Sequence, residues 1–385
     1  MSRKSALVAV LAVAGLLTTG CGQGLLAADD AKAGDGPIAL GMAVPMSGSS
    51  ADIGPYMKNG AQLAVNEINA GGGVLGRKLE LRVEDDACDP KTAVAAATKL
   101  ITSKIALSVG GYCSGATLPT LPVFAKAKVP MIIPAANSDD LYKQGIKSTF
   151  LINGTGTQQA DAAMARMDKA GSHRVAVIHD NTSYAKNIAT LMDPRLKRPG
   201  GPEQVAAAAL TPGESDYSAT VGEVLGANPD FIYWTGYDKE GGLLVRQLRQ
   251  AGYQGQIMVA DGAVSPSLAE IAGAENVRGV LATMTQTPET IEGGEAWTAS
   301  YRKEFGSAPG PFSTQSYDAV RLAAEAIRRA GGTEDTKVVA ALTEIKDFKL
   351  FSGPLSFTAD RTLTEGGFVI LVWRDGRFVR ADDGK

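Results

Sequence analysis

The stretch Gly110-Gly-Tyr-Cys-Ser-Gly-Ala-Thr117 is the part of the sequence best suited to hold a ligand. The apolar run Ile105–Val109 leads into it and the helix-like run Leu118–Lys126 follows it, which predicts strand, small-residue loop and helix. Free N–H groups and hydroxyls at such a helix start bind anions, including carboxylates. The stretch has no nucleophile with an adjacent base, so we expect it to hold a ligand rather than transform one. Taken alone, the octapeptide is also compatible with a simple turn.

Motifs of catalysis and cofactor binding are absent or stand in the wrong context. Gly71–Gly76 matches G-x-G-x-x-G, but it follows a helical pattern and precedes a strand pattern, the reverse of the dinucleotide arrangement. The sequence has no P-loop and no G-x-S-x-G elbow. His179 ends a predicted strand, where α/β sites cluster, but a structural role is favoured. We therefore expect no enzyme activity, no catalytic residue and no cofactor.

Asp85 and Asp86 are a second candidate for chemistry, since adjacent carboxylates can hold a metal or share a proton. They stand between a predicted strand and the helix predicted after Pro90. Carboxylates in such a place cap helices and accept hydrogen bonds from loop amides. A structural role is therefore favoured. The cysteines and the two histidines match no zinc spacing, so no metal site is expected.

The N-terminus has the pattern of an export signal. Two basic residues precede the apolar stretch Ala6–Leu17, and Thr18-Thr-Gly-Cys21 follows. A basic start, a short apolar core and a small-residue cleavage site predict a signal peptide over residues 1–20. The cysteine directly after the small residues indicates a bacterial lipoprotein, with Cys21 carrying lipid and residues 21–36 forming a flexible tether. A plain secreted protein cleaved further on is the alternative.

Three cysteines are an odd number for an exported chain. If Cys21 carries lipid, Cys88 and Cys113 remain as a pair. Their bond would close a loop of about 25 residues, which adds roughly 3–4 kcal/mol of stability in the chain-entropy model. An oxidising compartment outside the cytoplasm permits such a bond.

Length and charge narrow the possible architectures and partners. Removing the signal leaves about 365 residues, too many for one compact core and suitable for two lobes. The signal takes two of the 38 basic residues with it, so 36 face 41 acidic ones and the mature net charge is near −5. With no basic patch or arm, nucleic acid is not an expected partner.

Apolar runs of strand length alternate with helical stripes through the rest of the chain. Ala61, Ala64, Val65 and Ile68, for example, follow the i, i+3, i+4, i+7 spacing of a helix that faces a sheet. The predicted strands are Ile38–Val44, Leu79–Val83, Ile105–Val109, Val129–Pro134, Arg174–His179, Phe231–Trp234, Gln256–Ala260, Gly279–Thr283, Phe351–Phe357, Gly367–Trp373 and Arg377–Val379. Further predicted helices are Pro90–Ile101, Ala185–Leu196, Glu240–Ala251, Ser267–Ala272, Ile291–Phe305, Ser316–Arg329 and Asp335–Ile345. The alternation predicts three-layer α/β sheets with parallel strands.

Several short motifs recur in the order of a known family. They are Ala43-Val-Pro-Met-Ser-Gly48, Asn59-Gly-Ala61, Ile68-Asn69, Asp85-Asp-Ala-Cys-Asp-Pro90, Cys113-Ser114, Ile178-His-Asp180 with Tyr184, and Gly236-Tyr237. In these motifs the chain resembles the substrate-binding lipoproteins of ABC importers, specifically the leucine/isoleucine/valine-binding group. The resemblance runs from about Ile38 to the C-terminus.

The resemblance implies the type I periplasmic-binding fold, in which two three-layer α/β lobes are joined by three crossovers and grip a ligand between them. The implied lobes are residues 37–156 with 285–359, and residues 157–284 with 360–385. It also implies a disulfide between Cys88 and Cys113.

The resemblance further implies a site for a small zwitterion. Ser114, Ala135 and Asn137 would hold the ligand's carboxylate with hydroxyl, backbone and amide donors, and Tyr184 would close on the ligand from the second lobe. Ser114 could instead only cap its helix, and Tyr184 could be an ordinary surface aromatic. The family often has threonine in place of Asn137.

The ammonium end of that zwitterion would be taken by Tyr237 through its ring face and by Asp261 through its charge. Tyr237 could instead be a surface aromatic, and Asp261 could cap the helix at Pro266. The family usually has glutamate in place of Asp261, and an aromatic residue against the ligand's side chain in place of Ile53. These departures leave the identity of the ligand open.

The resemblance therefore predicts an extracytoplasmic solute-binding protein that captures a small amino acid and delivers it to the transmembrane subunits of an ABC permease. Branched-chain amino acids are the leading ligands, ahead of γ-aminobutyrate, aromatic amino acids, amides and urea. The alternative is a ligand-sensing receptor for a signalling partner. We expect a monomer at the outer face of the cytoplasmic membrane, held by lipid on Cys21, or in the periplasm.

Overall fold

Strands and helices alternate along the chain, which a computed structural model describes over residues 36–381. The first sheet has the strand order β2-β1-β3-β4-β5, and each neighbouring pair is parallel. Its strands are β1 Ile38–Val44, β2 Leu79–Asp85, β3 Leu107–Ser108, β4 Met131–Ile133 and β5 Thr149–Leu151. The parallel arrangement requires a helix or long loop between successive strands, which is what the sequence alternation predicted.

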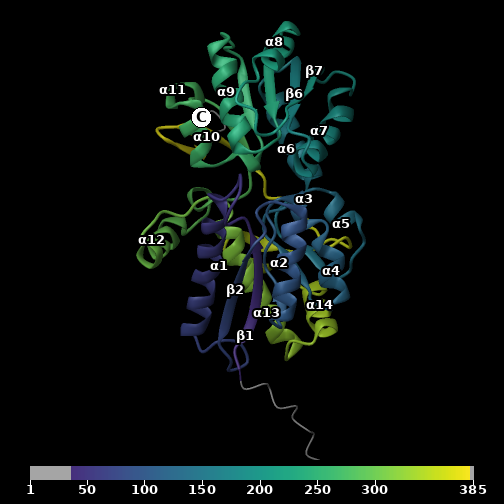
Figure 1. The fold of residues 1–385 in the computed structure, drawn as a ribbon, viewed down its shortest axis with the longest axis vertical. Coiled ribbons are helices and arrows are strands. Elements are labelled where there is room, and N and C mark those ends of the chain that lie inside the picture. The colour runs from purple at the N-terminus through teal and green to yellow at the C-terminus, as the bar shows by residue number, and fades with distance from the viewer. Residues whose placement is uncertain (1–35, 382–385) are drawn as a thin grey trace, which may run out of the picture. The chain divides into compact units, whose positions relative to one another are not determined.

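Helices cover both faces of the first sheet (Figure 1). One face carries α1 Ile53–Ala70 and α13 Ser313–Ala330, with α12 Gly294–Phe305 against α1 and α14 Asp335–Thr343 against α13. The other face carries α2 Pro90–Thr102, α4 Thr120–Lys126 and the short helix α5 Asp140–Lys143, and the short helix α3 Ser114–Thr117 contacts α2 and α4. Because α13 comes far later in the chain than α1, the C-terminal part of the chain returns to complete this layer. We call this sheet and its helices the first half.

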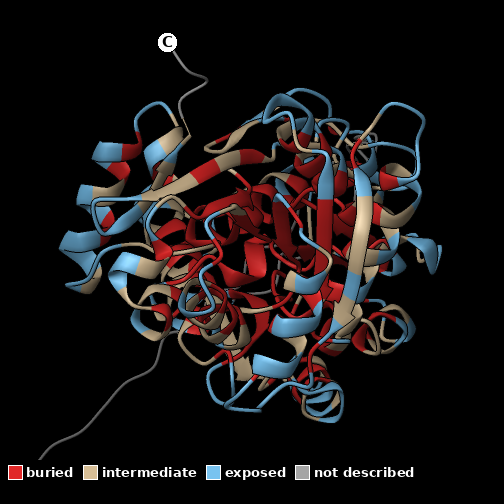
Figure 2. Ribbon diagram, turned by 90° about the horizontal axis from the view of Figure 1, so that it is seen from above, coloured by how far each residue is buried: buried red, intermediate tan, exposed pale blue. Residues whose placement is uncertain are grey.

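The side chains of β1 pack alternately against the two helix layers. Leu40 and Met42 belong to the core cluster that contains the buried residues of α1 and α13. Ala39 and Ala43 belong to the cluster that contains the buried residues of α2 and α4. Successive side chains of a strand point to opposite faces, so every residue of β1 is buried. Figure 2 shows the same concentration of buried residues along the inner elements.

The second sheet has the order β14-β13-β10-β9-β8-β6-β7. The strands are β6 Arg174–His179, β7 Glu203–Ala209, β8 Phe231–Trp234, β9 Gln256–Val259, β10 Leu281–Met284, β13 Val369–Arg374 and β14 Arg377–Arg380. The pairs from β7 to β10 are parallel, whereas β13 pairs antiparallel with both β10 and β14. The hairpin of β13 and β14, whose two strands the sequence predicted, therefore extends this sheet.

Helices also pack on both faces of the second sheet. One core cluster joins the strands to α6 Gly156–Lys169 and α7 Ser183–Leu196. The other joins them to α8 Ser218–Gly226, α9 Asp238–Gln250 and α10 Pro266–Ala272, and α11 Ala274–Val277 packs on α9 and α10. Short 3₁₀ turns lie at Asp261–Ala263 and Pro288–Thr290. We call this sheet and its helices the second half.

Within residues 36–381 the chain passes between the two halves three times. It leaves the first sheet after β5, returns after β10 to form α12, α13 and α14, and crosses again after the hairpin of β11 Phe348–Leu350 and β12 Gly353–Leu355. The predicted α/β class, with layered sheets and three crossovers, is confirmed.

Some predicted elements differ from the observed ones. The strand predicted at Phe351–Phe357 is present only as β12 Gly353–Leu355, because Phe351 and Ser352 form the turn between β11 and β12. The buried carboxylate of Asp318 fixes that turn, since it accepts hydrogen bonds from both backbone amides at 2.8 Å. The helix predicted at Leu118–Lys126 begins two residues later, as α4 after Pro119, and the separate short helix α3 precedes it.

Other predictions concern residues outside the described range. The predicted signal peptide of residues 1–20, the lipidation site Cys21 and the tether over residues 21–36 lie outside residues 36–381, except for Gly36. Among the described residues, no helix has both the length and the apolarity needed to cross a membrane.

Candidate functional site

Each sheet contains a point at which its parallel strand order reverses, and such points are where α/β sheets bind ligands. In the first sheet the reversal lies between β1 and β3, and in the second between β6 and β8. Ser114 and Asn137 follow β3 and β4, and Tyr184, Tyr237 and Asp261 follow β6, β8 and β9. The fold thus puts these predicted site residues at the carboxyl ends of strands.

A disulfide brackets the reversal point of the first sheet. Cys88 follows β2 and Cys113 follows β3, and their Cα atoms lie 5.4 Å apart, within the ordinary range for a disulfide. The predicted pairing of Cys88 with Cys113 is therefore confirmed. The Sγ of Cys88 also lies 3.6 Å from the hydroxyl of Ser50, in the loop after β1, so three loops of the first half meet here.

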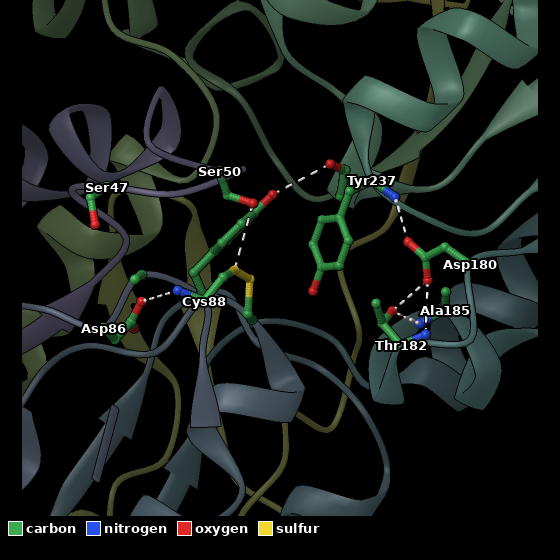
Figure 3. Close-up of a disulfide and its surroundings, with 12 residues drawn as sticks. Ser47, Ser50, Asp86, Cys88, Asp180, Thr182, Ala185 and Tyr237 are labelled. Atoms are coloured by element: carbon green, nitrogen blue, oxygen red, sulfur yellow. Dashed lines mark hydrogen bonds between the residues drawn. A yellow bond between two sulfur atoms is a disulfide. The ribbon is translucent and has the colours of Figure 1, made fainter. Parts of the chain in front are cut away.

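A cavity of about 550 Å³ opens beside this disulfide, within the size range of small-ligand pockets. Residues of both halves line it: Ser49, Ser50, Cys88, Pro90, Cys113, Gly115, Ala116, Asp180, Thr182, Ser183, Pro212, Gly213, Tyr237, Asp238, Lys239 and Glu240. Figure 3 shows the ring of Tyr237 between the Cys88 side and the loop that carries Asp180. The backbone N–H of Tyr237 donates to Asp180 at 3.3 Å, and Asp180 also accepts from Thr182, which holds this wall of the cavity in place.

The carboxylates of the acidic stretch at the end of β2 accept hydrogen bonds from backbone N–H groups of this loop and of the loop after β1. Asp85 accepts hydrogen bonds from the N–H groups of Met46, Ser47 and Ala87, and Asp86 accepts from Cys88. Asp89 accepts from the N–H of Thr92 and caps α2. The favoured structural role of this stretch is thus confirmed. Among residues 36–381, no group of three or more Asp, Glu, His or Cys side chains is arranged to hold a metal ion.

Asp261 has a different environment, because its partners are side chains from distant elements. It is 2% exposed. One carboxylate oxygen, Oδ1, accepts the hydroxyl of Tyr184 at 2.5 Å, the amide of Gln159 at 2.9 Å and the N–H of Gly262 at 3.1 Å. It does not cap the helix at Pro266, the alternative that the sequence left open. Asp261 is therefore the centre of a buried polar network.

The first half contributes to this network through Asn137 and Asn153. Their Nδ2 atoms lie 3.4 Å and 3.5 Å from Oδ2 of Asp261. Nδ2 of Asn137 also donates to Oε1 of Gln159 at 2.8 Å, and Nδ2 of Asn153 donates to the carbonyl of Ala135 at 2.5 Å. Burial raises the pKa of Asp261, while hydrogen bonds from Tyr184, Gln159, Asn153 and Gly262 act in the opposite direction.

Aromatic rings connect the cavity to Asp261. The ring of Tyr237, which lines the cavity, lies 5.2 Å from that of Tyr184 and 5.9 Å from that of Tyr112, measured between centroids. Burial, and then the charge of Asp261, raises the pKa of Tyr184 well above its ordinary value, so its hydroxyl stays protonated and can donate. Gly262 lets both rings approach, because a Cβ there would lie 2.8 Å from Tyr184 and 3.1 Å from Tyr237.

Hydrogen bonds also cross between the halves around this network. Tyr112 donates its hydroxyl to the carbonyl of Gly262 at 3.3 Å, and Ser267 donates to the carboxylate of Asp52 at 2.8 Å. Tyr112 and Asp52 belong to loops of the first half, and the other two residues to the second. The two halves therefore already touch through polar groups beside the cavity.

The remaining predicted residues lie in the first half. Ser114 is fully buried, and its hydroxyl oxygen accepts from the N–H of Ser138 at 3.2 Å. Among residues 36–381 no acceptor is seen for its own O–H, so this hydroxyl is available to a carboxylate. Ala135 is 4% exposed and follows β4, and Ile53 begins α1 in the same core cluster as Tyr112. No hydrogen bond joins Ser114 or Ala135 directly to Asp261 within the described residues.

Sequence reasoning missed Gln159, Asn153, Tyr112 and Gly262 as members of this site. Gln159 lies on α6, whose start carries a signal that could have been found. Thr155 and Gln158 form a capping box there, and the same segment supplies Gln159 one residue later. Tyr112 stands inside the loop that the sequence did single out. Asn153 and Gly262 carry no comparable local signal.

Known proteins are similar to this chain along nearly all of its length. The family model described as periplasmic binding protein matches residues 37–384. The Leu/Ile/Val-binding protein BraC3 of Rhizobium johnstonii is 33% identical over 90% of this chain and 94% of its own. The leucine-, isoleucine-, valine-, threonine- and alanine-binding protein of Pseudomonas aeruginosa is 31% identical over 96% of each chain.

A solved structure supports the same assignment. It is the branched-chain amino acid transporter substrate binding protein LivJ from Streptococcus pneumoniae in complex with isoleucine, with a TM-score of 0.81 and 29% identity. The match covers 90% of this chain and all of that one. Fold, strand-end site and sequence similarity over almost the whole length agree, and the chain belongs to the periplasmic binding protein family.

Proposed function

We propose that the protein is the extracytoplasmic substrate-binding component of an ABC importer that captures a small amino acid, with branched-chain amino acids as the leading ligands. Two relatives named for the amino acids they bind, and a structural neighbour solved with isoleucine, support this choice. The periplasmic family is one of substrate-binding proteins and implies an extracytoplasmic location. The proposed role is binding and delivery, without catalysis.

The observation that carries the proposal is the environment of Asp261. A carboxylate that is 2% exposed, and that no cationic side chain of residues 36–381 pairs with, is costly unless a ligand supplies the positive charge. The free hydroxyl of Ser114 and the start of α3 lie at the strand ends of the other half, where they suit a carboxylate. A zwitterion would place its positive charge at Asp261 and its carboxylate at Ser114.

The proposed mechanism is a clamp of two lobes, residues 37–156 with 285–359 and residues 157–284 with 360–385. The membership of the sheets supports these limits, since β1–β5 fall in the first lobe and β6–β10 with β13 and β14 fall in the second. From Gly36 onward the chain clusters as one compact unit, so the proposed lobes are in close contact in this conformation. Ligand binding would favour the closed arrangement, which docks on the permease.

Calorimetry of residues 36–385 with a panel of amino acids tests the proposal. The panel contains L-leucine, L-isoleucine, L-valine, γ-aminobutyrate, L-phenylalanine and urea. We expect saturable binding of at least one branched-chain amino acid and no binding of urea, which lacks both charges. Failure of every amino acid to bind would refute the proposed ligand class.

The membrane attachment is a separate proposal. Cys21 would be the lipidated first residue of the mature chain, and the mature protein would be a monomer. Expression of the full chain in a bacterial host, followed by membrane fractionation and mass spectrometry of the N-terminal peptide, tests the anchor. The Cys21→Ser variant should move to the soluble fraction. Size-exclusion chromatography with light scattering tests the monomer.

A further inference from the structure

The two oxygens of the Asp261 carboxylate are not equally provided with partners. Oδ1 accepts hydrogen bonds from Tyr184, Gln159 and Gly262 at 2.5–3.1 Å. Among residues 36–381, the only donors near Oδ2 are the amide nitrogens of Asn137 and Asn153, at 3.4 Å and 3.5 Å, which is longer than ordinary N–H···O bonds. A buried carboxylate oxygen therefore lacks a close donor.

The orientation of the neighbouring amides follows from the chemistry of their partners. Gln159 must point its Nε2 at Asp261, because an ionised carboxylate can only accept, so Oε1 of Gln159 faces Asn137 and requires Nδ2 there. Asn153 must point its Nδ2 at the carbonyl oxygen of Ala135, which also can only accept. Turning either asparagine amide over would place two oxygens against each other.

This orientation leaves two amide oxygens unused. Oδ1 of Asn137 and Oδ1 of Asn153 have no hydrogen-bond partner among residues 36–381, although the side chains are 1% and 0% exposed. The oxygen and nitrogen of one amide are about 2.25 Å apart by standard covalent geometry. Each unused oxygen therefore lies within about 5.7 Å of Oδ2 of Asp261, and two hydrogen bonds of ~2.9 Å to one nitrogen span that distance.

We propose that Asn153 is an ammonium-recognition residue of this site, acting with Asn137 and Asp261 as three acceptors for one primary ammonium group. The inference rests on the proposed function and deepens it. It gives Asn137 a role at the ammonium instead of the carboxylate, and it adds Asn153, which the sequence did not indicate. A primary ammonium has three N–H donors, one for each of the three oxygens that lack them.

The arrangement also explains how Asp261 can bind the ammonium group although its side chain is shorter than the glutamate usual in the family. Its short side chain leaves Oδ2 facing the first half, and the amide oxygens of Asn137 and Asn153 come from that half. The ammonium is then held from both sides of the gap between the halves, so recognition of the positive charge itself favours closure. A water molecule offers only two donors and carries no charge, so it satisfies this cluster incompletely.

Paired ligands separate ammonium recognition from general effects on the fold. Calorimetry would compare L-leucine, or the tightest-binding member of the amino-acid panel, with the analogue in which a hydroxyl replaces the ammonium. In Asn153→Leu, binding of the amino acid should weaken by roughly tenfold to a hundredfold, the range for a hydrogen bond to a charged group. Binding of the hydroxy analogue should weaken by less than about threefold. Equal losses for both ligands would overturn the proposal.

Tyr112→Phe is the matched control, because it removes a hydrogen bond between the halves without removing an acceptor for the ammonium. It should weaken both ligands to the same extent. Asn153→Ser serves as a second variant if Asn153→Leu does not fold, with circular dichroism and the melting temperature as checks.

A simpler probe decides the inference even if no amino acid in the panel binds. Methylammonium chloride and tetramethylammonium chloride carry the same charge, but only the first has N–H donors. At equal concentration, methylammonium should raise the melting temperature of the wild-type protein more than tetramethylammonium does, and Asn153→Leu should abolish the difference. An equal response of the wild-type protein to both salts would reject the acceptor cluster, whereas absence of amino-acid binding alone would reject the proposed function.

Discussion

The loop after β2 and the loop after β9 both place a buried carboxylate at the carboxyl end of a parallel strand, yet the two carboxylates have different partners. Asp85 and Asp86 accept backbone N–H groups of their own loop and of the loop after β1. Asp261 accepts mostly side chains, from both halves, and one of its oxygens has no close donor. A carboxylate satisfied by backbone amides fixes the loops that carry those amides, whereas a carboxylate with one oxygen that lacks a close donor is suited to a ligand.

The pKa directions follow burial and separate Asp85 from the other two carboxylates. Burial acts to raise the pKa of Asp85, but hydrogen bonds from Ser47, Met46 and Ala87 together leave it lowered. At Asp86 and Asp261 burial prevails and the pKa is raised. Hydrogen bonds thus stabilise the charged form of Asp85, whereas burial disfavours the charged form of Asp261. A positively charged partner would stabilise the charged form of Asp261.

The largest expected effect is a loss of ligand affinity when the carboxylate after β9 is removed, compared with the carboxylate at the end of β2. Asp261→Ala should weaken amino-acid binding by about 4 kcal/mol, on the order of a thousandfold, because the buried ammonium loses its counter-charge. Asp85→Asn should change affinity by less than about threefold, since Asp85 holds only loop amides. Calorimetry of both variants measures this difference. A similar loss of affinity in both variants would show that the two carboxylates do not differ in their role in ligand binding.

The free energy of unfolding should depend strongly on the disulfide that anchors the loop after β2. Replacing Cys88 and Cys113 by serine should lower the free energy of unfolding by about 3.5 kcal/mol, because the bond closes a loop with a sequence separation of 25 residues. Urea unfolding of the double variant measures this value, with Cys21→Ser as the control that leaves the pair intact. A double variant as stable as the wild-type protein would contradict it.

The pH dependence of stability tests Asp86, whose pKa burial raises from 3.8 to about 6. The folded state holds the proton more tightly than the unfolded chain does, so the resulting stabilisation is full below about pH 4 and is lost as the pH rises through 6. Relative to Asp86→Asn, the wild-type protein should lose up to about 3 kcal/mol over this range. Urea unfolding at intervals from pH 4 to 8 checks the sign, and equal pH profiles for both proteins would disprove the assignment.

The smallest expected effect concerns a single hydroxyl in the Asp261 network. Tyr184→Phe should weaken amino-acid binding by about 1–2 kcal/mol, because Oδ1 of Asp261 loses a donor and the N–H of Gly262 loses an acceptor. Tyr253→Phe is the control, since its hydroxyl donates only to the carbonyl of Gln256 within the second half. Calorimetry with the same amino acid compares them, and an unchanged affinity in Tyr184→Phe would exclude a role for this hydroxyl.

Local patterning predicted the fold best where strands are buried and apolar. β1, β6 and β8 have the bounds that the sequence predicted, because runs such as Phe231–Trp234 are apolar on both faces. β7 was missed because its alanine-rich sequence, Glu203–Ala209, resembles a helix, and its half-exposed edge position required little apolar surface. α6 was missed because small and polar residues dominate its exposed face.

The sequence alone determined the layered α/β class, the cysteine pair and the positions of Ser114, Asn137, Tyr184, Tyr237 and Asp261 at strand ends, since these depend on local patterns and on a family resemblance. Only the tertiary structure decided that Asn153 and Gln159, more than 100 residues from Asp261, meet its carboxylate. It also decided which amide oxygens remain unpartnered. The physical reason is that hydrogen-bond satisfaction is a property of the packed assembly of distant segments, and no local spacing encodes it.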